Sequence, residues 1–163
     1  MHYALCVTSI MKISLLAVGK MRSKPLKEVC DDYLARLARF GPAEVREVKA
    51  AESAGAEQSV AQECARILDS LEPADQVCVL DERGAQLSSV ELCTLIKSHE
   101  MRGTKRLVLV LGGAYGLSDE VRKRGKLLSL SKMTLPHELC RALVLEQLYR
   151  ARTIQNNQPY HHA

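Results

Sequence analysis

Residues 127–152 constrain the fold more than any other stretch of this chain. A short apolar run at 127–130 stops at a polar loop, and Pro136 then opens a long helical pattern. Because proline suits the first turn of a helix and disfavours helix at the residue before it, we expect the helix to begin near Pro136. Residues 139–148 are apolar on nearly every side, and a helix of this kind is buried all round. One face of a sheet cannot cover it, so we expect another subunit to pack on its far side.

Three charged residues interrupt this apolar helix. Glu146 and Arg150 are spaced i,i+4 with the acid first, which is the favourable order for an ion pair on a helix. Arg141 has no such neighbour on the helix, so we expect it to reach a ligand, a neighbouring subunit or solvent. A snorkelling arginine at a helix edge explains the residue equally well.

The rest of the chain alternates between strand and helix patterns. Short apolar runs predict strands at 12–18, 44–48, 76–80, 106–111 and 127–130. One-sided apolar spacing and serine caps predict helices at 25–40, 60–71 and 88–99, and a short one after Ser118. Residues 81–84 are expected to form the turn that ends the third strand. This alternation predicts an α/β fold with a mostly parallel sheet covered by helices on both faces.

Length and composition narrow the class of protein. The 163 residues, 47% hydrophobic and 26% charged, predict one soluble domain at 11–163, preceded by an extension at 1–10 of unknown role. No run approaches the roughly 18 apolar residues of a membrane span, and the first residues lack the basic region of a signal peptide. The six cysteines include no CxxC pair, so we expect reduced thiols, no metal site and a cytoplasmic location. They are Cys6, Cys30, Cys64, Cys78, Cys93 and Cys140.

Charge is distributed unevenly between the two parts of the chain. Residues 1–100 hold 12 basic and 15 acidic side chains, whereas residues 101–163 hold 11 basic and 4 acidic ones. A basic half predicts a polyanionic partner, in the first place nucleic acid, although a merely soluble basic surface would also explain it. The candidate phosphate contacts in this half are Arg122, Lys123, Arg124 and Lys126. An ordinary solvated helix face would also explain such a run of charges.

Three predicted strand ends carry loops suited to binding. Parallel sheets bind ligands beyond the carboxyl ends of their strands, and these ends are followed by Leu80-Asp81, by residues 112–118 and by residues 130–135. The sequence GGAYGLS at 112–118 permits close backbone approach and leads to a helix N-terminus with free N–H groups. It is neither a Walker loop nor a GxGxxG fingerprint. A plain turn would explain it on its own.

Taken together, GGAYGLS and the segment SLSKMTLPHELCRALVLEQLYRA resemble the signature of the SPOUT methyltransferases. Within that class the chain is most similar, from Met11 onward, to the ribosomal RNA large subunit methyltransferase H family. The resemblance implies a C-terminal trefoil knot, S-adenosylmethionine as cofactor and a homodimer with the site at its interface. It also implies methylation at N3 of a pseudouridine in large-subunit ribosomal RNA, on the assembled ribosome.

The resemblance also assigns roles to residues. It implies that the donor pocket consists of Leu80, Gly112, Leu130, Ser131, Lys132, Met133, Thr134 and Leu135. The tail supplies acceptor-side groups, because Tyr160 can stack on a base and His161 can donate to a phosphate or relay a proton. Arg141 and His137 are the next catalytic candidates, and His162 is an RNA-binding candidate at a position where the family often has Arg or Lys.

Two other functions fit the residues. A non-catalytic ribosome- or RNA-binding module would account for the basic half of the chain. A nucleotide-binding enzyme with a doubly wound sheet would account for the GGAYGLS turn, but it would need a glycine fingerprint after the first strand, which is absent.

Overall fold

Five strands, all parallel, form one sheet in the order β2-β1-β4-β3-β5. The computed structural model describes residues 10–52 and 55–162, so most of the expected extension at 1–10, including Cys6, lies outside it. The strands are β1 (Lys12–Val18), β2 (Ala43–Val48), β3 (Gln76–Gln86), β4 (Arg106–Leu111) and β5 (Lys126–Ser129). The parallel sheet predicted from the alternation of strands and helices is confirmed.

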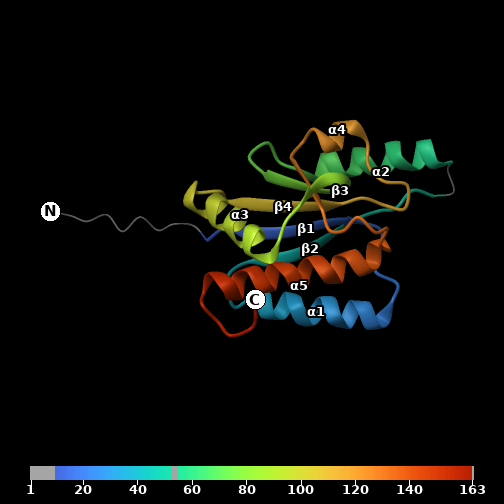
Figure 1. Cartoon of the computed structure of the whole chain (residues 1–163). Helices are drawn as coiled ribbons and strands as arrows, with labels where there is room; N and C mark the ends of the chain where they lie inside the picture. Colours follow the sequence, from blue (N-terminus) through green and yellow to red (C-terminus); the bar gives the residue numbers. More distant parts are fainter. Residues whose placement is uncertain (1–9, 53–54, 163) are drawn as a thin grey trace.

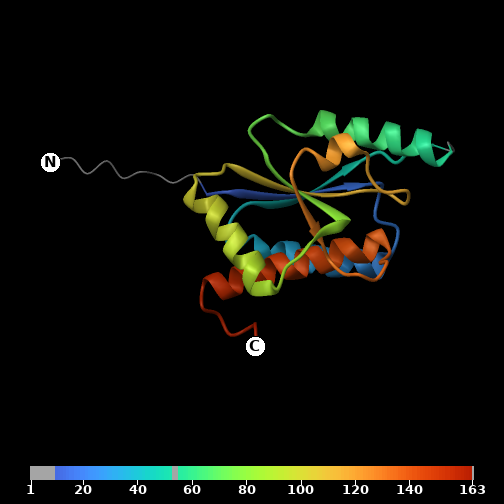
Figure 2. The same cartoon turned by 45° about the horizontal axis from the view of Figure 1, so that its top comes forward.

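Helices cover both faces of this sheet (Figures 1 and 2). One face packs against α1 (Lys24–Leu37), α3 (Ser89–Met101) and α5 (His137–Gln155), whose side chains form one core with those of the sheet. The other face packs against α2 (Ala56–Ser70) and α4 (Asp119–Arg122) in a second, smaller core. Burying apolar side chains on both faces accounts for the near-continuous apolar sequence RLVLVL of β4.

The local helix signals are confirmed. Helix α5 begins directly after Pro136, as the proline rules require. The Ser88–Glu91 capping box is present at α3, and the Ser118 side chain accepts a hydrogen bond at the start of α4. The ion pair between Glu146 and Arg150 forms at 2.6 Å.

The predicted turn at 81–84 is wrong. Strand β3 continues to Gln86 through a register shift after Leu80, and its last residues pair with Leu128 and Ser129 of β5. Gly84 lies so close to this neighbour that a Cβ atom on it would overlap the backbone of Leu128. Gly84 is therefore needed because the backbones of β3 and β5 approach closely here, and not because the chain reverses its direction.

Connections between the last strands cross both faces. The link from β3 to β4 passes through α3 on one face, the link from β4 to β5 passes through α4 on the other, and α5 returns to the α3 face. Because β5 lies outside β3, the second link crosses over β3. The loops after β3, β4 and β5 consequently meet at one edge of the sheet.

Residues 10–52 and 55–162 contain neither a candidate membrane span nor a candidate metal cluster. No helix there is long and apolar enough to cross a membrane, and no group of three or more His, Cys, Asp or Glu side chains is placed to hold a metal. The five cysteines in these ranges are buried free thiols, as predicted. Burial raises the pKa of the Cys78 thiol to about 11.

Candidate active site at the carboxyl edge of the sheet

The predicted donor residues come together at the carboxyl edge of the sheet. Leu80 and the whole loop from Leu130 to Leu135 line a pocket of about 200 Å³, beside Cys140 at the start of α5. Gly112 lines an adjoining hollow, and the two hollows share the leucines that separate them, Leu80, Leu111 and Leu135. Segments about 50 residues apart in the sequence thus form a single site.

The Leu130–Leu135 loop presents backbone groups to this pocket. The Ser129 hydroxyl donates to the carbonyl of Ser131 at 3.0 Å, and the Ser131 hydroxyl accepts from the N–H of Met133 at 3.0 Å, which fixes the shape of the loop. Within the described part of the chain, no hydrogen bond engages the backbone N–H groups of Lys132 and Thr134. Free N–H groups beside leucine walls suit an adenine ring, which needs apolar contact on its faces and donors at its edge.

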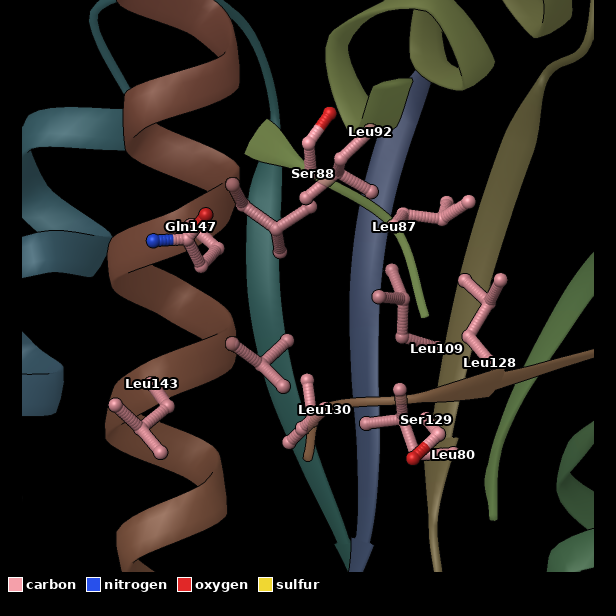
Figure 3. A pocket seen from close by; sticks show the side chains of 12 residues that line it. Leu80, Leu87, Ser88, Leu92, Leu109, Leu128, Ser129, Leu130, Leu143 and Gln147 are labelled. Carbon is pink, nitrogen blue, oxygen red and sulfur yellow. The ribbon is translucent and has the colours of Figure 1, made fainter. Parts of the chain in front are cut away.

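A second hollow, of about 250 Å³, lies next to this pocket and shares Leu80, Ser129 and Leu130 with it. Figure 3 shows its lining side chains converging from β3, β5, the start of α3 and one side of α5. Most of these side chains are leucines, and Leu130 and Leu143 expose more than a third of their surface. Leu143 thus lies on a side of α5 that its own chain leaves exposed, where we expect another subunit to pack.

Helix α2 contacts the glycine loop, residues 112–118, which the sequence did not indicate. Glu63 is buried, its Oε1 accepts the N–H of Ala51 at 3.0 Å, and its Oε2 lies where a Cβ atom of Gly113 would be. The next residue, Cys64, accepts the N–H of Ser118 on its sulfur at 3.1 Å. Two consecutive residues of α2 thus contact both ends of the loop. Sequence patterns could not reveal this, because Glu63 is a charged residue on what is otherwise an apolar face.

The Arg141 side chain is buried against its own chain. Its side chain is 1% exposed, and it donates to Glu47 at 2.8 Å and to the carbonyls of Val18 and Gly19 at 2.7 and 2.8 Å. The expectation that it leaves the chain for a partner is wrong, because its partners lie at the ends of β1 and β2, far away in sequence. Arg141 ties α5 to the end of β1.

Comparison with known proteins now identifies the family. A family model described as "Predicted SPOUT methyltransferase" matches residues 11–161. Proteins named ribosomal RNA large subunit methyltransferase H are 46% identical in Pelobacter propionicus, 44% in Trichlorobacter lovleyi and 41% in Geobacter sulfurreducens. Each match spans 93% of this chain and 100% of the relative. The chain belongs to the ribosomal RNA large subunit methyltransferase H family.

A solved structure agrees with this assignment at the level of the fold. A structure described as that of "a probable methylase family protein" from Haemophilus influenzae gives a TM-score of 0.54 at 14% identity, over 91% of this chain and 67% of the other. The two proteins therefore share the α/β fold.

In this methyltransferase-family chain the C-terminal tail folds back onto α5 and α1. The Tyr160 hydroxyl donates to Glu146 at 3.0 Å and lies 3.2 Å from the hydroxyl of Tyr33. Its ring packs edge-on against Tyr149, and the guanidinium of Arg150 lies 4.7 Å from the ring centre. Burial, together with the hydrogen bonds to Tyr33 and Glu146, raises the pKa of the Tyr160 phenol.

The tail is not beside the donor pocket of its own chain. His161 lies 3.4 Å from Arg150, on the middle of α5, whereas His137 lines the hollow that contains Gly112. Glu146, which holds Tyr160, lies about 14 Å from His137 along α5 at the helical rise of about 1.5 Å per residue. Of the four catalytic candidates, the structure therefore brings only His137 to the pocket.

The predicted RNA-binding cations divide into two groups. Arg122 lines the hollow that contains Gly112, here called the glycine-loop hollow. Its guanidinium already donates to Asp81 at 2.7 Å and to Asp119 at 3.0 Å. Burial alone would raise the pKa of Asp81, yet hydrogen bonds from the Arg83 N–H and from Arg122 outweigh it and hold the pKa below its usual value. Lys123 is exposed.

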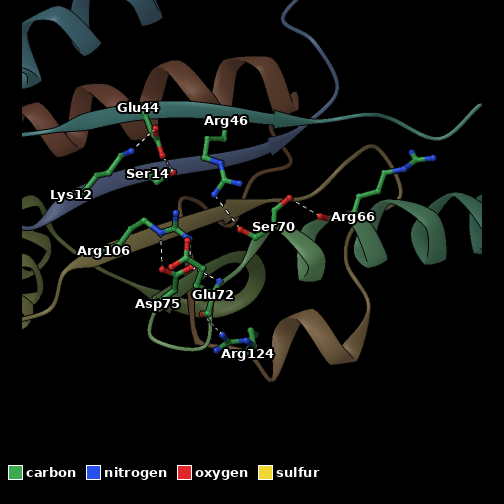
Figure 4. Close-up of polar contacts among 10 residues, drawn as sticks. All are labelled: Lys12, Ser14, Glu44, Arg46, Arg66, Ser70, Glu72, Asp75, Arg106 and Arg124. Atoms are coloured by element: carbon green, nitrogen blue, oxygen red, sulfur yellow. Dashed lines mark hydrogen bonds and ion pairs between the residues drawn. The ribbon is translucent and has the colours of Figure 1, made fainter.

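The other two cations lie at the opposite edge of the sheet. Lys126 is the first residue of β5, and Arg124 donates to the carbonyl of Glu72 at 2.8 Å (Figure 4). Figure 4 also shows the neighbouring ion pair of Arg106, the first residue of β4, with Asp75. Strands start at this edge, so Arg124 and Lys126 are separated from the donor pocket by the length of the sheet. The exposed His162 lies on the tail.

Proposed function

We propose that this protein transfers a methyl group from S-adenosylmethionine to N3 of a pseudouridine in large-subunit ribosomal RNA, on the assembled ribosome. The observation that carries the proposal is the meeting of the 112–118 and 130–135 loops at two adjoining hollows, one of which has free N–H groups. The names of the relatives, which all refer to large-subunit ribosomal RNA, support the substrate class.

The residues of the chain bind and orient the donor. Leu80, Leu111 and Leu135 would enclose the adenine, and the N–H groups of Lys132 and Thr134 would bond to its edge. The bound donor supplies an already activated methyl group, so the protein needs only to align it with the acceptor nitrogen. No cysteine nucleophile is required for methylation at nitrogen, which agrees with buried thiols.

The proposal includes a homodimer and a C-terminal trefoil knot. The crossing of the β4–β5 link over β3, followed by the return of α5 to the opposite face, supports the knot. Exposed apolar side chains beside the pocket support the dimer, namely Leu130, Met133 and Leu143. Since the tail lies away from the donor pocket of its own chain, Tyr160 and His161 would act in the pocket of the partner subunit.

In this arrangement, the residues that act on the acceptor base are those of the tail and His137. Tyr160 would stack on the base, and His161 would hold or remove the imide proton released from N3. Arg141 contributes by fixing the end of β1 against α5, because its donors are already engaged with Glu47, Val18 and Gly19. It is therefore a positioning residue in this proposal.

Calorimetry and a methylation assay test the proposal. Purified protein should bind S-adenosylmethionine and should transfer a labelled methyl group to ribosomes from a strain that lacks this protein. Deletion of residues 160–163 should abolish transfer and leave donor binding nearly intact, whereas Gln158→Ala, an exposed change in the same tail, should leave both intact. Absence of donor binding by the intact dimer would refute the proposal.

A non-catalytic RNA-binding module is the alternative that the basic second part of the chain favours. It predicts RNA affinity that falls with salt, without any transfer from labelled donor. The methylation assay separates the two functions directly.

A further inference from the structure

Residues 20–24, here called the β1–α1 loop although Lys24 is already the first residue of α1, carry three cations on their outer side. Exposure alternates along this loop, because Lys20, Arg22 and Lys24 are exposed while Met21 and Ser23 are half-buried. Met21 packs against the larger core, and the Ser23 hydroxyl accepts the N–H of Leu26 to cap α1. Anchoring two alternate residues inward directs the three cations outward.

Carboxylates bind the backbone of this loop. The N–H of Met21 donates to Glu47 at 3.1 Å, and the N–H groups of Arg22 and Ser23 donate to Glu138 at 2.6 and 3.3 Å. The N–H of Arg22 contributes most to lowering the pKa of the Glu138 carboxyl group, and with the N–H of Ser23 it outweighs the opposing effect of burial. Three N–H groups of the loop are therefore engaged by carboxylates, which fixes its backbone and leaves the exposed cationic side chains to meet an anion.

The three cations have no acidic partner. Within residues 10–52 and 55–162, Lys20, Arg22 and Lys24 form no ion pair, whereas Lys27 on the next turn pairs with Asp31 at 2.5 Å. Three unpaired cations within five residues raise the local potential more than a mixed surface does.

The loop also lies beside the donor site. Glu138, which binds it, follows His137 of the glycine-loop hollow, and Figures 1 and 2 show the loop next to the start of α5. By contrast, Arg124 and Lys126 lie across the sheet, roughly 20 Å away for a six-residue strand. Neither Lys20 nor Arg22 lines the described donor pocket, so their charge is free for the acceptor.

We propose that the β1–α1 loop binds backbone phosphates of the ribosomal RNA substrate through Lys20, Arg22 and Lys24. The inference rests on the proposed function and names the surface that holds the acceptor strand. Long cationic side chains on a fixed backbone suit phosphates, which demand charge without a particular base sequence. The 122–126 segment, which sequence alone favoured, has its Arg122 committed to two aspartates.

A triple variant with Lys20→Gln, Arg22→Gln and Lys24→Gln tests the loop. We expect the KM for ribosomes to rise about tenfold at moderate salt, and the slope of log affinity against log salt to fall by about 2, as for the loss of three phosphate contacts. The kcat at saturating ribosomes and the affinity for S-adenosylmethionine should stay within twofold of the wild-type protein, because the donor pocket is unchanged.

The matched control removes the same charge elsewhere. Lys97→Gln, Arg102→Gln and Lys105→Gln alter two lysines and one arginine that are exposed on α3 and before β4, towards the other edge of the sheet. An equal loss in both variants, or an unchanged salt slope in the loop variant, would overturn the inference. If the wild-type protein methylates ribosomes in the same experiment, the proposed function stands even when the inference fails.

Discussion

Loss of the Arg141 guanidinium should lower the free energy of unfolding more than other substitutions of similar size. Its guanidinium donates to the buried carbonyl of Val18, to the partly buried carbonyl of Gly19 and to Glu47. We consider Arg141→Met, which keeps an unbranched side chain as far as the position of Nε and removes every donor.

The expected cost follows from the burial of each acceptor. Losing a charged donor costs about 1.5–3 kcal/mol at a buried acceptor such as the Val18 carbonyl. Gly19 is less buried, and the Glu47 side chain is 34% exposed, so water recovers most of the energy lost there. The Nε of Arg141 is buried and has no partner among the described residues, so its removal offsets part of the loss. The total should be about 3 kcal/mol, which lowers Tm by about 6–12 °C in a chain of this length.

Urea denaturation of Arg141→Met measures this cost directly. The control is Arg150→Met, which makes the same change on the same helix at a guanidinium that is 25% exposed and paired with Glu146. It should cost about 1 kcal/mol or less. Losses under 1 kcal/mol for both variants would show that the Val18 and Gly19 carbonyls are satisfied without Arg141, and would refute its role in holding the β1–α1 loop.

Three further predictions concern other parts of the chain. Gly113→Ala should destabilise the protein by about 1–3 kcal/mol, because the new Cβ atom overlaps the Glu63 carboxylate. The loss should be much smaller in a Glu63→Ala background, where that carboxylate is absent, and a double-mutant cycle measures the difference. Burial opposes the lowered pKa of Asp75, but hydrogen bonds from Arg106 and the backbone outweigh it, so its stabilisation is complete above pH about 4 and is lost as pH falls further. Acid titration of Asp75→Asn should therefore show a shallower loss of stability between pH about 4 and 2 than the wild-type protein. Cys78, with a pKa of about 11, should resist alkylation at pH about 8 until urea unfolds the protein, as mass mapping of its peptide would report.

Local signals predicted the elements of the fold well. Pro136 and the Ser88–Glu91 box act within one helical turn, and the RLVLVL run is decided by burial on both faces of the sheet. These causes are visible over a few residues of sequence. Residues 81–84 failed as a turn for the opposite reason, since their pairing depends on β5, which lies more than 40 residues later.

The place of the proposed donor pocket was predictable in part for a different reason. The loops at 112–118 and 130–135 could be placed at one edge because every parallel strand ends there. The partners of Arg141 could not be predicted, because its carbonyl acceptors are more than 120 residues away and carry no side-chain signal. The position of the tail on α5 also depends on tertiary contacts, chiefly those of Tyr160 with Glu146 and Tyr33.

Counting charges along the chain says how many cations there are, but not which way they face. The first 100 residues carry more acids than bases, yet Glu47 and Glu63 from this part direct their carboxylates at backbone N–H groups of loops. Glu47 is paired with Arg141 and Glu63 is buried, so neither adds an unpaired, exposed carboxylate beside the exposed Lys20 and Arg22. A part of the chain with a net negative charge can therefore hold the most cationic loop at the donor edge, and the orientation of each charge decides where a polyanion binds.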